Sequence, residues 1–295
     1  MIKKKKIWIL MVCSILAITG CSNKDTEPTM EPVAGLEKLG SIQVVAREEG
    51  SGTRSTFAQL AEFQTDENKE KKTDLTREDA QIAENAEAVI EAVKADPATI
   101  GYVSQGALEK ETNVKVLTVN GKKVDEKSGK YPLSRFFYLA YGGKLTELKQ
   151  DFLMFVHGAG QEIVAKNYEA VGKSSSFLSN KSKGILRITG STSIEPLMQE
   201  LAREYQKKNP NATIQIIPSD STDGLTQTMA GNSDFGMSSR ELKDYEKELL
   251  DYEIIANDNI AVIVNPQNPM EDITLDILKK IYTGEINQWK EINEQ

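Results

Sequence analysis

Short apolar runs and runs with helical periodicity alternate along most of this chain. Buried strands are expected at the short apolar runs 42–46, 100–103, 185–189, 213–217 and 235–237. Amphipathic helices are expected where apolar residues recur at helical spacing, at 57–63, 82–93, 148–156 and 194–205. Strands and helices that alternate at this interval predict an α/β fold with a mainly parallel sheet.

Other stretches predict connections and boundaries. The apolar segments 114–119 and 131–141 predict extended chain, and Asn120-Gly121 predicts a two-residue hairpin turn. The charged region 64–81 predicts an exposed loop or insertion, and the Gly/Lys/Ser-rich stretch 172–184 predicts a linker. A further helix is expected to begin at 238–241, because Ser-Ser-Arg-Glu contains the spacing of a capping box.

The first residues have the pattern of a lipoprotein signal. Four lysines at 3–6 precede an apolar run of twelve residues at 7–18, which is short for a membrane span. The sequence Ile-Thr-Gly-Cys at 18–21 predicts cleavage before Cys21 and lipid attachment to it, so that 1–20 is a signal peptide and 21–38 a flexible tether. An ordinary signal peptide or an uncleaved anchor is the alternative. Since Cys13 lies in the segment to be removed, no disulfide or thiol chemistry is expected.

Length and composition fit two lobes or domains of ordinary size. The chain has 295 residues, of which 39% are hydrophobic and 27% are charged. Its formal net charge of −8 argues against a nucleic-acid partner. It does not exclude a small anionic ligand, because local dipoles and one or two arginines determine the potential in a buried site.

The stretch Arg-Glu-Glu-Gly-Ser-Gly-Thr-Arg at 47–54 lies between a predicted strand and a predicted helix. The N-terminus of a helix leaves backbone N–H groups unpaired and carries a partial positive charge. Gly50 and Gly52 allow close approach of the backbone to a ligand, and Ser51 and Thr53 can cap the helix or donate hydroxyls. The stretch therefore predicts either an anion site or an ordinary N-capped turn.

Three more turns have the same chemistry: Thr192-Ser193, Ser221-Thr222 and Ser238-Ser239. A single such turn is routine helix capping, whereas four of them indicate a ring of donors around one small oxyanion. A tetrahedral anion taken out of water needs many good hydrogen bonds in return. Hydroxyls and helix dipoles can supply most of them without a large positive charge.

An enzyme that uses Ser51 or Ser193 as nucleophile is the competing function. His157 is the only histidine, and it lies at the end of a predicted helix, where pairing with the helix dipole explains it. No general base is expected beside either serine, and no metal-ligand cluster or cofactor motif occurs. Binding is therefore favoured over catalysis. A sensor or adhesion lipoprotein that keeps the fold without a permease is the third possibility.

Several motifs along 40–292 carry a resemblance to a known family. They are Arg47–Arg54, Ile-Gly-Tyr-Val-Ser at 100–104, Gly-Ser-Thr-Ser-Ile-Glu-Pro at 190–196, Gly-Met-Ser-Ser-Arg-Glu-Leu at 236–242, Ile-Val-Asn-Pro at 263–266, and Ile-Tyr-Thr-Gly-Glu-Ile at 281–286 with Trp289. Together they resemble the PstS-type phosphate-binding proteins of ABC transporters.

The order of these motifs differs from the family's usual order. There the Gly-Ser-Thr-Ser motif comes first, and the Arg-Glu-Glu-Gly-Ser-Gly-Thr-Arg motif follows the segment that ends in Trp289. The resemblance therefore implies a circularly permuted member, whose usual ends correspond to the linker 172–184. A fragment of a longer tandem protein is the alternative.

The resemblance implies a two-lobed periplasmic-binding-protein fold of type II. Each lobe is expected to hold a mostly parallel sheet flanked by helices, and two strands near 133–141 and 260–264 are expected to cross between the lobes. One lobe would combine 39–134 with 263–295, and the other would span 135–262. Closure would bring Thr53 and Ser193 to opposite sides of one anion.

The resemblance also implies ligand and partners. Transferred motif by motif, the phosphate contacts fall on Arg47, Ser51, Gly52, Thr53, Thr192, Ser193, Ser221 and Ser239, with Thr222, Ser238 and Arg240 as weaker candidates. Ser239 stands where the best-studied branch has an aspartate, which leaves sulfate, molybdate or tungstate as alternatives. Asp220 or Asp223 could replace that aspartate or merely cap a helix. Arg240 could reach the anion or only pair with Glu241. A monomer on the outer face of the membrane is implied, held by acyl chains on Cys21, with an ABC permease as partner and no cofactor or metal.

Overall fold

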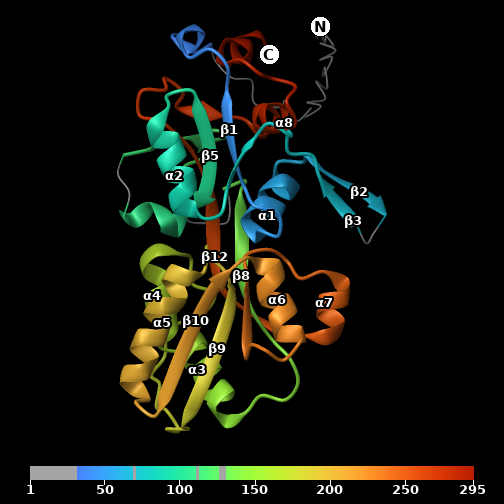
Figure 1. Ribbon diagram of the computed structural model, residues 1–295. Helices are drawn as coiled ribbons and strands as arrows, with labels where there is room; N and C mark the ends of the chain where they lie inside the picture. Colours follow the sequence, from blue (N-terminus) through green and yellow to red (C-terminus); the bar gives the residue numbers. More distant parts are fainter. Residues whose placement is uncertain (1–31, 69–70, 111–112, 126–130) are drawn as a thin grey trace, which may run out of the picture.

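The computed structural model describes residues 32–68, 71–110, 113–125 and 131–295, and it forms two lobes that are joined by two long strands (Figure 1). The predicted signal peptide, Cys21 and most of the predicted tether lie outside the described residues. Within the described part, no helix combines the length and the apolar character that crossing a bilayer requires.

One sheet runs through both lobes. From one edge to the other its strands are β10 (Ala212–Ser219), β9 (Gly184–Ser191), β11 (Phe235–Ser238), β8 (Ser134–Tyr141), β12 (Asp251–Val264), β5 (Thr99–Ser104), β1 (Gln43–Arg47) and β4 (Gln81–Ala83), and β6 (Lys115–Val116) pairs with β12 outside this order. The strands β9, β10 and β11 are mutually parallel, as are β1, β4 and β5. Each lobe thus has a parallel half-sheet, and antiparallel β8 and β12 join the two halves.

The strand β12 passes from one lobe to the other. Its first part pairs with β8 up to Asn259, and its last part pairs with β5 from Ile260 onward. Core membership changes at the same place, because Ile255 and Ala256 pack in the lower lobe of Figure 1 and Ile260 packs in the upper one. We therefore propose that one lobe combines 39–134 with 260–295 and that the other spans 135–259. The second boundary between the lobes thus moves from the expected 262–263 to 259–260.

Helices cover both half-sheets. The upper lobe contains α1 (Gly52–Leu60), α2 (Ala86–Ala95), α8 (Leu275–Thr283) and the short 3-10 helices η1 (Leu36–Lys38), η2 (Gln105–Lys110) and η3 (Trp289–Glu294). The lower lobe contains α3 (Glu147–His157), α4 (Gly160–Asn167), α5 (Glu195–Lys208), α6 (Ser221–Met229) and α7 (Asp244–Leu249). Short strand pairs complete the fold: β2 (Gln64–Asn68) with β3 (Lys71–Asp74), and β7 (Thr118–Val119) with β13 (Asp272–Ile273).

Aromatic side chains fill the core of each lobe. In the upper lobe the rings of Phe57 and Tyr102 stack at 4.1 Å, and Tyr282 packs edge-on against Phe57 at 4.9 Å. In the lower lobe Phe152 packs against Tyr205 at 5.1 Å. Such side chains each contribute about 1.5–3 kcal/mol when fully buried, so each lobe has a core of its own.

Most of the predicted strands and helices are present, and the Asn120-Gly121 turn has the positive φ values that a two-residue hairpin turn requires, 51° and 70°. In the region expected to be an exposed loop or insertion, 64–68 and 71–74 pair as the β2–β3 hairpin. Two expectations were wrong: Ile82 lies in β4 rather than in α2, and 238–241 does not begin a helix. The helix α7 starts later, where the Lys243 N–H donates to the Glu246 carboxylate at 2.7 Å.

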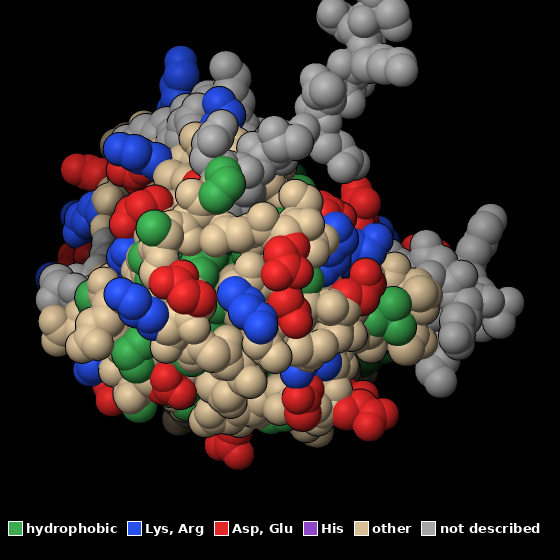
Figure 2. Space-filling model, turned by 90° about the horizontal axis from the view of Figure 1, so that it is seen from above, with side chains coloured by type: hydrophobic (Ala, Val, Ile, Leu, Met, Phe, Trp, Pro, Cys, Tyr) green, Lys and Arg blue, Asp and Glu red, His purple; other side chains and the backbone are tan. Residues whose placement is uncertain are grey.

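The two ends of the described chain lie side by side in the upper lobe. The Val33 N–H donates to Asn293 Oδ1 at 2.7 Å, Ser41 forms a β-bridge with Gln288, and Leu36 is fully buried. The predicted tether 21–38 is therefore too long at its C-terminal end, because the fold includes at least residues 33–38. Figure 2 shows the molecule from above, from the side of the upper lobe. Acidic and basic side chains are interspersed on this face, which is typical of a solvated surface.

Candidate functional site

Three predicted turns meet between the lobes. Each lies at the start of a helix: α1 begins just after Ser51, α5 follows Ser193, and α6 begins at Ser221. The first helix belongs to the upper lobe and the other two to the lower lobe. Because helix N-termini carry unpaired N–H groups and partial positive charge, their convergence favours an anion between the lobes.

Five buried hydroxyl groups from both lobes gather there. This hydroxyl cluster consists of Thr53, Ser191, Ser193, Ser221 and Ser239, none of which is more than 5% exposed. Thr53 Oγ1 of the upper lobe lies 2.8 Å from Ser193 Oγ of the lower lobe. Ser239 Oγ lies 2.9 Å from Ser191 Oγ and 3.3 Å from Ser221 Oγ, and the Ser239 N–H donates to Ser221 Oγ at 3.0 Å. The cluster thus holds one hydroxyl pair that spans the two lobes and one chain of three hydroxyls within the lower lobe.

Two glycines make the close approach of the lobes possible. A Cβ at Gly52 would lie 2.6 Å from Ser239 Oγ and 3.0 Å from the backbone nitrogen of Arg240, and closer still to Ser221 Oγ. A Cβ at Gly50 would lie 2.9 Å from the Asp220 carboxyl group, and Gly50 has a φ of +92° that L side chains rarely adopt. At both positions glycine is required where one lobe touches the other.

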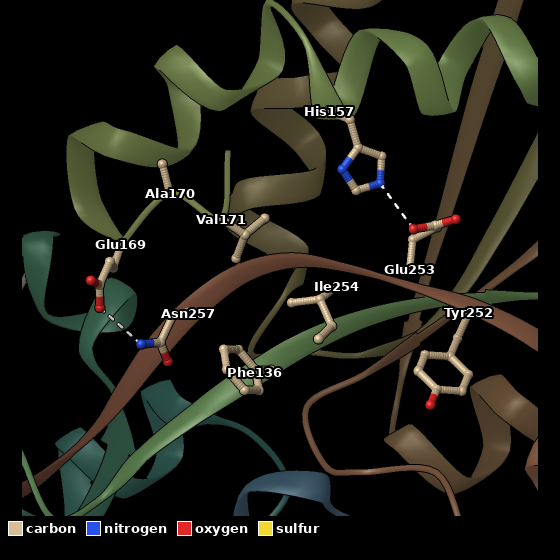
Figure 3. A pocket seen from close by; sticks show the side chains of 9 residues that line it. All are labelled: Phe136, His157, Glu169, Ala170, Val171, Tyr252, Glu253, Ile254 and Asn257. Atoms are coloured by element: carbon tan, nitrogen blue, oxygen red, sulfur yellow. Dashed lines mark hydrogen bonds and ion pairs between the residues drawn. The ribbon is translucent and has the colours of Figure 1, made fainter. Parts of the chain in front are cut away.

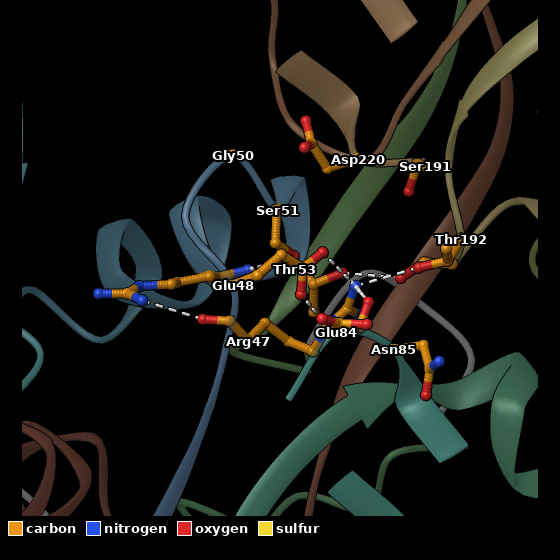
Figure 4. A network of polar contacts seen from close by, with 12 residues as sticks. Arg47, Glu48, Gly50, Ser51, Thr53, Glu84, Asn85, Ser191, Thr192 and Asp220 are labelled. Atoms are coloured by element: carbon orange, nitrogen blue, oxygen red, sulfur yellow. Dashed lines mark hydrogen bonds and ion pairs between the residues drawn. The ribbon is translucent and has the colours of Figure 1, made fainter. Parts of the chain in front are cut away.

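Arg47 lies at the side of the cluster, at the C-terminal end of β1, and is 2% exposed (Figure 4). Its Nε and Nη2 atoms form two bonds of 2.7 Å with the Glu48 carboxylate. Nη2 also donates to Thr192 Oγ1 of the lower lobe at 3.0 Å and to the Glu84 carbonyl at 3.2 Å. Arg47 therefore links the lobes through Thr192, while Glu48 holds one side of its guanidinium group.

A second arginine, Arg135 on β8, reaches the cluster from the crossing strands. Its Nη1 donates to Thr53 Oγ1 at 2.8 Å, and its Nε donates to Asp258 Oδ2 at 3.0 Å. Asp258 on β12 also accepts from Ser104 Oγ at 2.9 Å. Burial raises the pKa of Asp258, and the charge of Arg135 opposes that rise; burial likewise lowers the pKa of Arg135 against the effect of Asp258.

The sequence analysis missed Arg135, Asp258 and Ser191. One signal could have revealed Arg135: it is a charged residue inside an otherwise apolar strand segment, where a charge is costly unless it is paired. Asp258 lies between Asn257 and Asn259, so no such contrast marks it. Ser191 belongs to the predicted Gly-Ser-Thr-Ser turn, so its neighbours were identified and it was not.

The remaining predicted residues lie around the cluster rather than in it. Ser51 Oγ caps α1 by accepting from the Arg54 N–H at 3.4 Å, and Ser238 Oγ donates to the Arg240 carbonyl at 2.8 Å. Thr222 Oγ1 donates to the Gly50 carbonyl at 3.1 Å, which is another contact between the lobes.

Arg240 pairs within its own lobe. Its two terminal nitrogens each lie 2.8 Å from the carboxylate of Glu246, and Nη1 also donates to the Glu241 backbone carbonyl at 2.9 Å. An ion pair with the Glu241 side chain was one expectation for Arg240, and it was wrong, because that carboxylate pairs with Lys247 instead.

Asp220 caps α6, as one of the two interpretations held, since its Oδ1 accepts from the Asp223 N–H at 2.8 Å. Both aspartates line a cavity of about 490 Å³ at the edge of the hydroxyl cluster. Thr192 and Ser193 belong to the same wall, and the other carboxylates of that wall are those of Glu48, Glu84, Glu87 and Glu195. Burial and the charge of Glu87 raise the pKa of Glu195. An anion that enters here passes carboxylates before it reaches the hydroxyls.

A larger cavity of about 810 Å³ lies elsewhere, beside the crossing strands (Figure 3). Phe136 and Tyr252 line it together with His157, whose Nε2 lies 3.6 Å from a Glu253 carboxylate oxygen. No member of the hydroxyl cluster lines this cavity. Neither Ser51 nor Ser193 lines the cavity that His157 lines. The described residues contain no group of acidic, histidine or cysteine side chains arranged to hold a metal.

Comparison with known proteins gives consistent matches. A family model described as a PBP superfamily domain matches residues 175–295. The phosphate-binding protein PstS 2 of Streptococcus pneumoniae serotype 4 is 37% identical over 259 residues, which cover 86% of this chain and 88% of that protein. The PstS of Bacillus subtilis is also 37% identical, but only over 117 residues and 38% of each chain.

Among solved structures, a phosphate-binding protein of a phosphate ABC transporter from Streptococcus pneumoniae is similar to this chain with a TM-score of 0.70 and 36% sequence identity. The match covers 86% of this chain and all of the other. The shared fold, two α/β lobes with two crossing strands, is that of the type II periplasmic binding proteins.

Proposed function

Because this chain belongs to the PstS-type phosphate-binding proteins of the PBP superfamily, we propose that it captures inorganic phosphate between its two lobes and delivers it to the permease of an ABC transporter. The single observation that carries the proposal is the approach of Thr53 Oγ1 to Ser193 Oγ at 2.8 Å across the lobes. Hydroxyls from two lobes that face each other at three helix N-termini can surround one tetrahedral anion on both sides.

The proposed ligands are the residues of the hydroxyl cluster together with backbone N–H groups and arginine. Thr53, Ser193, Ser221 and Ser239 supply hydroxyls, Gly52 supplies close backbone approach, and Arg47 and Thr192 close one side. Ser51, Thr222, Ser238 and Arg240 shape the walls by capping and pairing. Such an arrangement offsets the cost of removing the water shell of the anion.

Calorimetric titration of residues 22–295 with phosphate, sulfate, molybdate and tungstate tests the proposal. We expect a phosphate dissociation constant on the order of micromolar or lower, and sulfate affinity about 100-fold weaker. If sulfate, molybdate or tungstate binds as tightly as phosphate or more tightly, that anion becomes the proposed ligand in place of phosphate. An absence of binding to all four would refute an oxyanion receptor.

The competing functions predict different results in other assays. A hydrolase that used Ser51 or Ser193 would release phosphate from a chromogenic phosphate ester, and we expect no release. A sensor without a permease would leave phosphate uptake unchanged when the chain is deleted from its host. We expect uptake to fall, because capture and delivery of phosphate are the proposed role. We propose that the protein acts as a monomer.

The location follows from the same assignment. We propose that the protein works on the extracytoplasmic side of the membrane, and that acyl chains on Cys21 hold it there. Replacement of Cys21 by Ser should move the protein from the membrane fraction to the soluble fraction. Retention in the membrane fraction would contradict lipid attachment at this residue.

Circular permutation relative to other PstS proteins is part of the proposal. Two observations support it: the long match to PstS 2 of Streptococcus pneumoniae contrasts with the 38% coverage of the Bacillus subtilis PstS, and the segments near Val33 and Asn293 are hydrogen-bonded neighbours. Ends that lie close together at a surface are the geometry that permutation needs.

A further inference from the structure

Arg135 and Asp258 form a buried ion pair on the two crossing strands. They are direct partners in the register of β8 and β12, and their side chains are 2% and 0% exposed. Asp258 Oδ2 accepts from Arg135 Nε at 3.0 Å, and Asp258 Oδ1 accepts from Ser104 Oγ at 2.9 Å. The guanidinium group also lies over the Phe137 ring, 5.2 Å from its centroid. These contacts fix the guanidinium group in one orientation.

That orientation directs one edge of the guanidinium group at the hydroxyl cluster. Nη1 donates to Thr53 Oγ1 of the upper lobe at 2.8 Å and to the Ser239 carbonyl of the lower lobe at 3.2 Å. Thr53 Oγ1 is also 2.8 Å from Ser193 Oγ, so that only the Thr53 hydroxyl separates Arg135 from Ser193 on the other side of the proposed site. A single side chain on the crossing strands therefore contacts both lobes.

The pairing of Arg135 is incomplete, unlike that of the other arginines at the site. Nη2 of Arg135 is buried and lies 2.9 Å from Asp258 Oδ2, but it makes no hydrogen bond to the described residues. Arg240 is held by two bonds to Glu246, and Arg47 by two bonds to Glu48. The Asp258 carboxylate offsets the charge of Nη2, but a buried N–H group that makes no hydrogen bond is costly, and an anion oxygen is an acceptor that would satisfy it.

We infer that Arg135 is a further phosphate-binding residue, which contacts the anion from the crossing strands and is positioned by Asp258. This inference rests on the proposed function. An anion inserted between Thr53 and Ser193 would lie against the Nη edge of Arg135, where a planar guanidinium group can form charge-assisted hydrogen bonds to its oxygens. Because Arg135 also touches both lobes, the same contacts would favour the closed arrangement when phosphate is bound.

The test compares phosphate affinity in variants that keep the buried charge balanced. In Arg135→Met/Asp258→Asn no lone charge is left buried, and the asparagine oxygen can still accept from Ser104. We expect phosphate to bind about 10- to 100-fold more weakly, the range for loss of a hydrogen bond to a charged group. Arg135→Lys keeps the charge but loses the planar donor pair, and we expect binding about 5- to 20-fold weaker. Arg203→Met, at an exposed arginine of α5, should bind like the wild type.

Thermal unfolding without phosphate is measured alongside, because a purely structural role would lower the melting temperature and leave affinity in the folded protein unchanged. Wild-type affinity in either Arg135 variant overturns the inference and leaves the proposed function intact. If the double variant does not fold, Arg135→Lys alone decides. A wild-type protein that binds no phosphate overturns the proposed function and this inference together.

Discussion

Substitution of Gly52 by Ala tests whether closure of the lobes is needed for binding. The new methyl group would lie 2.6 Å from Ser239 Oγ and 3.0 Å from the backbone nitrogen of Arg240. An ordinary carbon contact is about 3.5–4.0 Å, so the closed arrangement is short of space by about 1 Å on the side of the lower lobe. The backbone atom cannot rotate away, and the lobes must separate.

The cost falls on the closed form alone. Overpacking of this kind costs about 1–3 kcal/mol, which corresponds to a loss of phosphate affinity of about 5- to 150-fold. Within the upper lobe the change is harmless, because Gly52 is the first residue of α1 and Ala is the better helix former by up to about 1 kcal/mol.

Thermal unfolding with and without phosphate measures both effects. At a ligand concentration 100 times its dissociation constant, the wild type gains about 2.7 kcal/mol of stability. A variant that binds 50-fold more weakly gains only about 0.6 kcal/mol at that concentration. The control is Gly172→Ala in the linker, where the new methyl group would have only ordinary contacts at 3.9 Å. A Gly52→Ala protein with wild-type phosphate stabilisation would refute the role of lobe closure.

Three further predictions concern charge and connectivity. Arg47→Ala should weaken phosphate binding about 10- to 100-fold in a calorimetric titration, because it removes a buried guanidinium group from the side of the site; unchanged affinity would remove Arg47 from the site. Glu246→Gln should lower the free energy of unfolding by about 3 kcal/mol, since it leaves Arg240 buried without its carboxylate. Burial opposes ionisation of Glu246, but hydrogen bonds from Arg240 hold its pKa below the usual value. The contribution of ionised Glu246 to the free energy of unfolding is therefore complete above the unfolded pKa of about 4.3 and is lost as pH falls through the lower folded pKa. This pH dependence should be missing when urea unfolding of the variant is measured across the same pH range. A chain that joins 295 to 32 through a short Gly/Ser linker and opens within 172–184 should fold and bind phosphate within about threefold of the wild type, and failure of a correctly folded product to bind would contradict the permutation.

The turns that form the hydroxyl cluster could be predicted from the sequence because their chemistry is local. A Gly/Ser/Thr group between an apolar strand and a periodic helix marks a helix N-terminus, and Ser51, Ser193 and Ser221 lie at such positions. Ser238-Ser239 has similar composition but opens no helix, since Ser239 is buried among hydroxyls of other segments. Tertiary contacts there replaced the local capping pattern.

Arg135 and Asp258 could not be placed from local pattern, because 123 residues separate them along the chain. Their pairing depends on the register of β8 against β12, which the sequence alone does not specify. The β2–β3 hairpin was missed for a different reason: its residues are mostly polar, so the sequence shows no alternation of apolar and polar residues there. The docking of η1 was missed because the apolar residues in and beside it, Val33, Leu36 and Leu39, span a segment that is too short to show a periodic pattern.

A crystal structure of the protein with phosphate would test the central claim most directly. We predict one anion between the lobes that accepts hydrogen bonds from both Thr53 Oγ1 and Ser193 Oγ, in place of the present contact of 2.8 Å between these hydroxyls. A bound anion held by one lobe only, with the two hydroxyls still bonded to each other, would contradict the account.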